Sequence, residues 1–113
     1  MSRSVISGHR IALTKGGLKE PVVMVESDAG FDELNSRHDL VKHNPKGFEW
    51  GYSGSGPAQL ALAILAYTLE DDKRALAHYQ RFKSEIIQNL DSAWELGEGT
   101  IQAWVDRVEH EDG

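Results

Sequence analysis

A glycine-rich turn at residues 52–57 carries the residue types best suited to hold a ligand. It reads Tyr52-Ser53-Gly54-Ser55-Gly56-Pro57, and an apolar run of helix formers follows. Such a turn at the start of a helix points backbone N–H groups at a phosphate or carboxylate. Two aromatic rings that alternate along the preceding segment would add a platform for a base. The candidate anion-binding residues are therefore Trp50, Tyr52, Ser53, Gly54, Ser55 and Gly56.

The same turn also has a purely structural interpretation, which we favour. No Gly-Lys-Ser/Thr follows, as a phosphate-binding loop would require, and the third glycine of a dinucleotide fingerprint is absent. Glycine is needed to turn a strand sharply into a buried helix. Phe48, Trp50 and Tyr52 would project from one face of a strand, and they are core residues if the helix covers that face. Anion binding stays as the alternative.

Neither a metal site nor a catalytic site can be assembled from the sequence. The chain has five histidines and no cysteine. His38 and His43 are five residues apart, which fits neither a helical nor a strand pair of ligands, and no third ligand is evident. Ser53 and Ser55 lack the Gly-x-Ser-x-Gly frame of a nucleophile elbow. We therefore predict no catalytic residue, no metal and no cofactor, and we expect that the protein is not an enzyme.

The charge is distributed unevenly along the chain. Residues 1–56 hold seven basic and seven acidic side chains, whereas residues 57–113 hold five basic and eleven acidic ones. Nonspecific affinity for nucleic acid comes mainly from clustered Lys and Arg, so we expect no nucleic-acid binding through a basic patch. The acidic helical half would suit a basic protein partner, although a solvated helix surface explains it as well.

The first half of the chain has the pattern of strands. Residues 11–14 and 21–26 read as two strands, of which the second is rich in β-branched side chains, and Lys15-Gly16-Gly17 between them predicts a hairpin. Residues 31–44 read as a loop with at most one short strand. Asn44-Pro45-Lys46-Gly47 predicts a turn, and the alternation in residues 48–52 predicts another strand.

The second half has the pattern of helices. Residues 58–67 are almost wholly apolar, which is typical of a buried helix, and Pro57 suits its first position. Apolar residues recur at spacings of three and four through residues 72–90 and again through 101–108, with a glycine break around Gly97. The prediction is an α+β fold in a single domain, residues 1–113. A small antiparallel sheet from residues 1–52 packs against a buried helix and two amphipathic helices within residues 57–109.

Composition also suggests a compartment. The absence of cysteine suits a reducing cytoplasm, and Met1-Ser2-Arg3-Ser4 does not open a signal peptide. The longest apolar stretch, residues 58–67, is far shorter than the roughly 20 residues that span a bilayer. We therefore expect a cytoplasmic protein without a membrane segment.

The segment from Phe48 to Leu65, FEWGYSGSGPAQLALAIL, resembles the signature of an uncharacterised family, domain of unknown function 6166. The resemblance extends through Phe82 and the stretch from Trp94 to Trp104. It implies a cytoplasmic protein of bacteria, archaea or phage, often associated with mobile elements, and it supplies no catalytic residue. The association with such elements suggests an anti-defence role that acts on a host or defence component.

Two functions follow from these observations. The first is a small noncatalytic binding or inhibitory protein that acts through protein–protein contacts. The alternative is a protein that binds a small anionic ligand, such as a nucleotide, at the Gly54 to Gly56 turn. Association with further copies of the chain is left open by the sequence.

Overall fold

Four antiparallel strands form one sheet in the computed structural model, which describes residues 4–12, 19–45 and 47–112. Strands β1 (Val5–Ala12), β2 (Lys19–Ser27) and β3 (Gly30–Glu33) pair in sequence, and β4 (Trp94–Gly97) adds to the other edge of β1. The order is β3-β2-β1-β4. The antiparallel pairing of the first two strands is confirmed, but the bounds predicted for the first strand, residues 11–14, are wrong, because β1 begins at Val5 and pairs with β2 from there. Residues 13–14 and the turn at Lys15-Gly16-Gly17 lie outside the described residues.

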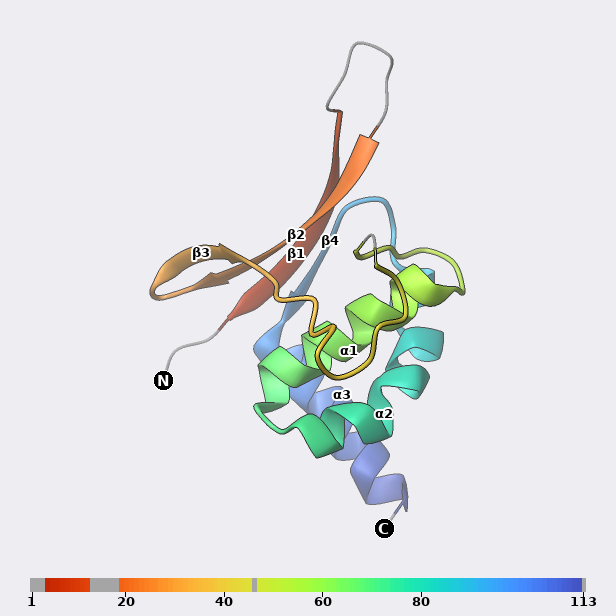
Figure 1. Cartoon of the computed structure of the whole chain (residues 1–113). Coiled ribbons are helices and arrows are strands. Elements are labelled where there is room, and N and C mark those ends of the chain that lie inside the picture. The colour runs from red at the N-terminus through yellow and green to blue at the C-terminus, as the bar shows by residue number, and fades with distance from the viewer. Residues whose placement is uncertain (1–3, 13–18, 46, 113) are drawn as a thin grey trace.

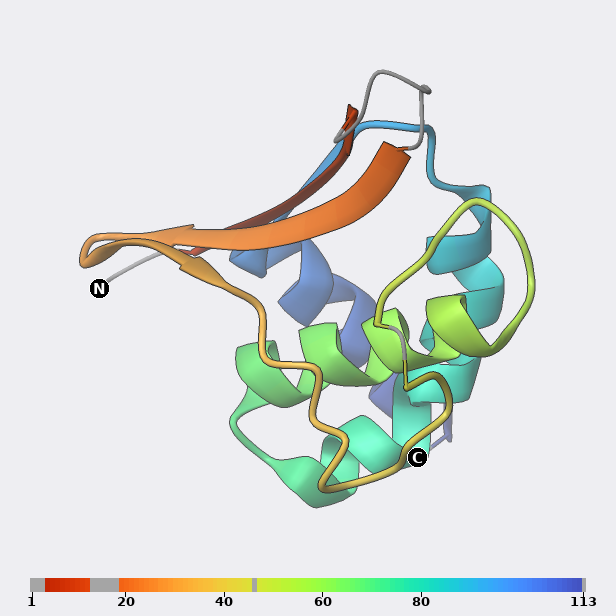
Figure 2. The same cartoon turned by 45° about the horizontal axis from the view of Figure 1, so that its top comes forward.

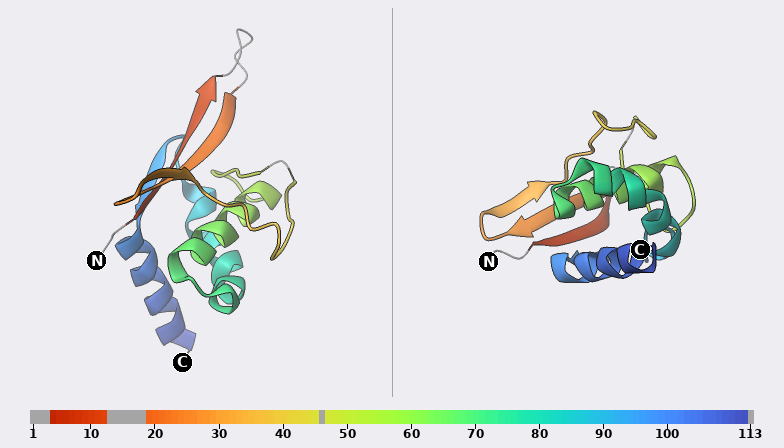
Figure 3. Two further views of the ribbon diagram at one scale, coloured as in Figure 1. Left: turned by 60° about the vertical axis from the view of Figure 1, so that its left-hand side comes forward. Right: turned by 90° about the horizontal axis from the view of Figure 1, so that it is seen from below.

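Three helices pack on one side of this sheet. They are α1 (Ser55–Leu69), α2 (Asp72–Glu85) and α3 (Glu98–Asp112), with a short 3-10 turn, η1 (Ile87–Asn89), after α2. Figures 1 and 2 show all three below the sheet, and Figure 3 shows α3 running beside the α1–α2 pair. The predicted α+β fold is confirmed. No helix in the described part of the chain has the length and apolar character needed to cross a membrane.

Helix α1 lies in the middle of the core, as its apolar sequence predicts. Leu60, Leu62 and Ile64 have no exposed surface, and every other residue of the helix except Ser55 and Tyr67 is buried too. A helix that is apolar all round is stable only when neighbours cover every face. The helix ends at Glu70, whose left-handed backbone (φ 51°) lets its N–H bond to the carbonyl of Ala66.

The inner face of the sheet joins this core through alternate residues. Ile6, Val23 and Val25 are buried, and Trp94 of β4 lies over Gly8 of β1. A Cβ atom at Gly8 would lie only 2.4 Å from the Trp94 ring, so only glycine permits this close approach. No described helix or strand lies over the face of the sheet that is turned away from the helices (Figures 1 and 2).

The strand predicted at residues 48–52 is wrong. The segment is irregular, and it is held by a hydrogen bond of 3.0 Å from the Gly51 N–H to the Ile87 carbonyl of η1. Gly51 has a positive φ of 86°, which a regular strand does not adopt. The three aromatic residues therefore do not share one face: Phe48 is half-buried, Trp50 is 2% exposed and Tyr52 is 51% exposed.

Three other boundaries differ from the sequence prediction. Residues 94–97 form strand β4, although the glycines there predicted only a break, and α3 begins at Glu98 instead of residue 101. The second helix ends at Glu85, and η1 replaces its predicted last turn. The turn predicted at residues 44–47 is present, with the Gly47 N–H bonded to the Asn44 carbonyl at 3.3 Å, and Lys46 lies outside the described residues.

Candidate functional site

The glycine-rich turn leads directly into α1, as predicted. Gly54 is the N-cap in an extended conformation, its carbonyl accepts from the Ala58 N–H at 3.1 Å, and no side chain caps the helix. A Cβ atom at Gly56 would lie 2.6 Å from Cβ of Glu49, so this glycine lets the preceding loop pack on the helix start. An acidic side chain of the chain itself thus lies beside the turn. Anion binding there stays a prediction.

The two rings proposed as a platform point into different surroundings. Trp50 packs edge-to-face on Trp94, with ring centroids 5.6 Å apart, and the guanidinium of Arg10 lies 4.5 Å from the Trp50 ring centre. Arg10 also forms an ion pair of 2.8 Å with Glu49. Tyr52 instead faces solvent beside Gly54. Trp50 therefore anchors the loop to β1, and only Tyr52, Ser53 and Ser55 of the predicted side chains are exposed at the turn.

The histidines take part in separate contacts. His43 Nε2 lies 2.7 Å from the Tyr79 hydroxyl, and His38 Nε2 lies 2.8 Å from the Asn44 carbonyl. His78 contacts Glu109 at 3.0 Å. Within the described residues, no group of three histidine, aspartate or glutamate side chains is placed to hold a metal ion.

The outer face of the sheet, which we call the open face, carries an apolar surface with acidic residues around it. The strand register directs Val5, Val22, Met24 and Phe31 to this side, with Ile11 toward one end. Phe31 is 68% exposed and Ile11 is 40% exposed. Large exposed apolar side chains that are contiguous commonly mark interaction sites. This surface was not singled out from the sequence.

The charged strand residues that the register directs to the open face are all glutamates. They are Glu20, Glu26, Glu33 and Glu95. None of the four forms an ion pair or a side-chain hydrogen bond within the described part of the chain. No described strand residue directed to this face is Lys or Arg. The described strand residues of the open face therefore carry negative charge that none of them compensates.

The acidic helical half is different, because several of its carboxylates have cationic partners. Glu109 pairs with Arg74 at 2.7 Å, Glu85 with Arg81 at 2.6 Å, and Asp72 with Arg37 at 3.0 Å. Hydrogen bonds from Arg74 lower the pKa of Glu109 to about 2. Counting Glu111, which pairs with Arg81, four of the eleven acidic residues in this half thus have a cationic partner among the described residues.

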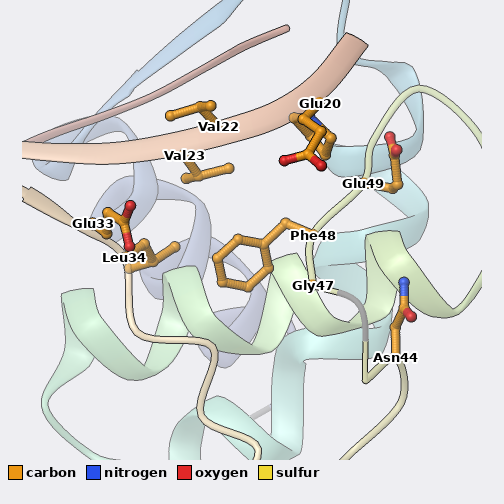
Figure 4. A pocket seen from close by; sticks show the side chains of 10 residues that line it. Glu20, Val22, Val23, Glu33, Leu34, Asn44, Gly47, Phe48 and Glu49 are labelled. Atoms are coloured by element: carbon orange, nitrogen blue, oxygen red, sulfur yellow. The ribbon is translucent and has the colours of Figure 1, made fainter. Parts of the chain in front are cut away.

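A groove of about 530 Å³ lies along one edge of β2. Figure 4 shows it between β2 and α1, with the Phe48 ring between Leu34 and Glu49 and with Val23 above. The carboxylates of Glu20 and Glu33 line it as well. We call this space the β2 groove. It brings together residues from β2, β3 and the loop before α1, which no local sequence pattern connects.

The comparison with protein families identifies the chain. A model described as a family of unknown function, domain of unknown function 6166, matches residues 7–107. The chain belongs to this family. A comparison with curated proteins found no match, and neither did a comparison with solved structures.

The match to the domain of unknown function 6166 family spans both surfaces described above. It begins in β1 and ends within α3, so it includes the β2 groove and most of the open face. It also reaches further toward the N-terminus than the segment that carried the resemblance in the sequence. The family has no assigned function, so membership in it assigns no activity to this chain.

Proposed function

We propose that this protein is a noncatalytic binding protein that docks a partner protein on its open face. The observation that supports this is the absence of a second layer over the sheet, where Phe31, Met24 and Val22 form an uncovered apolar surface. An apolar centre with charged residues around it is the usual anatomy of a protein interface. Exposed aromatic residues such as Phe31 supply large contact areas.

The charge on the open face determines which partner it suits. Four glutamates that form no ion pair with any described residue favour a partner that carries Lys or Arg around an apolar patch. A second copy of the chain would place like charges opposite one another if two open faces met, which costs binding free energy. The proposed partner is therefore a different protein with a basic surface. Host proteins and components of defence systems are the first class of partner to test, as expected from the association with mobile elements.

The decisive experiment identifies a partner and then tests the face. Immobilised protein captures candidates from a cell lysate, and a captured protein is purified for calorimetry. We expect Phe31→Ser to weaken its binding at least tenfold, a loss of about 1.4 kcal/mol or more, because Phe31 would be a buried aromatic anchor. Glu95→Lys should slow association and reduce its dependence on salt.

A matched control comes from the helical side of the molecule. Leu76 on α2 is 39% exposed, so Leu76→Ser removes an exposed apolar side chain far from the open face. It should leave the affinity unchanged. The proposal fails if Leu76→Ser weakens binding and Phe31→Ser does not.

A further inference from the structure

One stretch of β2 has a free edge that begins where β3 ends. Strand β3 pairs with Met24 to Ser27 of β2, and the Leu34 N–H then donates to the Val23 carbonyl at 3.2 Å. From there the chain leaves the sheet. The loop that returns at residues 47–49 lies across from this edge without forming a strand, and the space between them is the β2 groove (Figure 4).

Proline makes this edge unsuitable for another strand. The carbonyl of Val23 points toward the groove side, and residues two apart in a strand direct their backbone groups to the same edge. Pro21 therefore presents its backbone nitrogen there, and proline has no N–H to donate. Natural proteins protect exposed edges in this way. The occupant of the β2 groove should accordingly be a side chain and not an added strand.

The lining of the β2 groove suits an aliphatic stem that ends in a cation. Val23, Leu34 and Phe48 provide apolar surface, while Glu20 and Glu33 provide carboxylates that have no ion pair within residues 4–12, 19–45 and 47–112. Arginine combines an apolar stem with a planar cation that binds carboxylates and stacks on aromatic rings. The volume of about 530 Å³ is within the range of pockets that hold small ligands.

One arginine of the chain itself already contacts both an aromatic ring and a carboxylate beside the groove. Arg10 places its guanidinium 4.5 Å from the centre of the Trp50 ring and forms an ion pair of 2.8 Å with Glu49. Glu49 also lines the β2 groove, but Arg10 neutralises its charge. Among the described lining residues, the acidic side chains without a cationic partner are thus Glu20 and Glu33.

We infer that the β2 groove is a receptor for one arginine side chain of the partner protein, held by Glu20 and Glu33 over the Phe48 ring. The inference rests on the proposed function and specifies the partner's chemistry. Glu20, Val22 and Glu33 line the groove although the register directs them to the open face, so the groove reaches around the free edge of β2 to that face. One partner surface can therefore cover the face while one arginine enters the groove.

The test uses small probes and does not need the partner. N-acetyl-arginine methylamide is titrated into isotope-labelled protein at low salt, and chemical shifts are followed by NMR. We expect saturable shifts at Val23, Leu34 and Phe48, with a dissociation constant on the order of 1 mM for so small a ligand. The neutral citrulline analogue should cause no saturable shift there, because it keeps the shape and lacks the charge.

Two double variants distinguish binding in the groove from a general attraction of the probe to acidic residues. The double variant Glu20→Gln, Glu33→Gln should weaken binding of the arginine probe at least tenfold. The control Glu26→Gln, Glu95→Gln removes equal charge from the open face outside the groove lining and should leave the affinity within twofold. Equal shifts with citrulline, or equal losses in both double variants, would overturn the inference.

The inference and the proposed function can fail separately. If Phe31→Ser abolishes partner binding and the arginine probe causes no shift in the groove, the binding function stands and the arginine receptor is wrong. If the probe binds in the groove but Phe31→Ser leaves partner binding unchanged, the groove is a site and the open face is not the interface.

Discussion

Gln59 is a buried polar side chain inside the most apolar helix of the protein. It has no exposed surface, and its amide forms four hydrogen bonds to the loop of residues 36–44. The amide nitrogen donates to the carbonyls of Ser36 and Val41 at 2.7 and 3.0 Å, and the amide oxygen accepts from the N–H of His43 at 2.8 Å. A buried amide satisfied in this way positions a loop that has no regular structure of its own. This loop precedes the wall of the β2 groove.

We predict that Gln59→Leu destabilises the protein. Leucine has a similar volume, but it leaves the loop's backbone donors and acceptors without partners in the core, which costs about 2–4 kcal/mol in total. Urea unfolding measures the change in free energy, and hydrogen exchange should show faster exchange at His43.

A second glutamine provides the control for this prediction. Gln102 on α3 forms one hydrogen bond, from its side-chain nitrogen to the Thr68 carbonyl at 3.3 Å, and it is half-buried. Gln102→Leu should cost less than about 1 kcal/mol, because water can replace the lost partner. Equal losses for the two variants would contradict the special role of Gln59.

At the scale of elements, ion pairs join α2 to α3. Arg74 donates two hydrogen bonds to Glu109, at 2.9 and 2.7 Å, and His78 contacts the same carboxylate. At the C-terminal end of α2, Glu85 accepts from the Trp104 indole of α3 at 3.1 Å and from Arg81 of its own helix at 2.6 Å. Because these groups are only partly buried, each contact is worth little alone, and the network acts mainly by fixing how the two helices lie together.

The network predicts a loss of stability in acid. The hydrogen bonds from Arg74 lower the pKa of Glu109 from 4.5 to about 2, and desolvation opposes them. Since the folded pKa is below the unfolded value, the stabilisation is complete above about pH 4.5 and is lost as the pH falls toward 2. The stability difference between the wild-type protein and Glu109→Gln, on the order of 1 kcal/mol at pH 5, should therefore shrink as the pH is lowered.

Urea unfolding at pH 5, 4 and 3 measures this difference. Glu95→Gln is the control, because Glu95 is exposed and has no ion pair among the described residues. Its stability difference from the wild-type protein should stay constant over the same range. A difference for Glu109→Gln that is also constant would show that the contact with Arg74 does not persist in solution.

For the molecule as a whole, one cluster of buried apolar side chains connects the sheet to all three helices. It includes Ile6 of β1, Val25 of β2, Leu62 of α1, Phe82 of α2 and Val105 of α3. Elements that share one core are expected to unfold together, because unfolding one of them exposes apolar surface of the others. The strand-rich and helical parts of the chain should therefore behave as one cooperative unit.

We predict a single unfolding transition that is the same for every probe. The three tryptophans report on different places, since Trp50 lies before α1, Trp94 is in β4 and Trp104 is in α3. Tryptophan fluorescence and far-ultraviolet circular dichroism should give the same midpoint and slope in urea. Transitions that do not coincide would mean that the sheet and the helices are separate units.

Local patterns were enough to predict the α+β class, the pairing of the first two strands and the buried helix. The apolar run of residues 58–67 is too continuous for a surface helix, and the β-branched stretch at residues 21–26 favours a strand. Each of these patterns is contained in about ten consecutive residues, so it can be recognised without knowing which distant segments contact it. The same holds for the glycine turn, which the structure places at the start of α1.

Strand β4 and the segment at residues 48–52 depended on distant contacts. Trp94 pairs with Gly8, near the other end of the chain, and four residues of strand carry too little pattern to predict that pairing. Residues 48–52 alternate as a strand does, yet the Gly51 N–H bonds to η1 instead of to the sheet. Alternation over five residues describes side-chain types, whereas the partner of each backbone group is decided by the fold.

The open face shows most clearly what the sequence alone determined and what the tertiary structure decided. In β2, Val22 and Met24 alternate with Val23 and Val25, so the sequence establishes a strand that is apolar on both sides. It does not say which side the helices cover. Because the helices lie on the side of Val23 and Val25, which are buried in the core, only the tertiary structure leaves Val22 and Met24 on the opposite surface and brings Phe31 and the glutamates beside them.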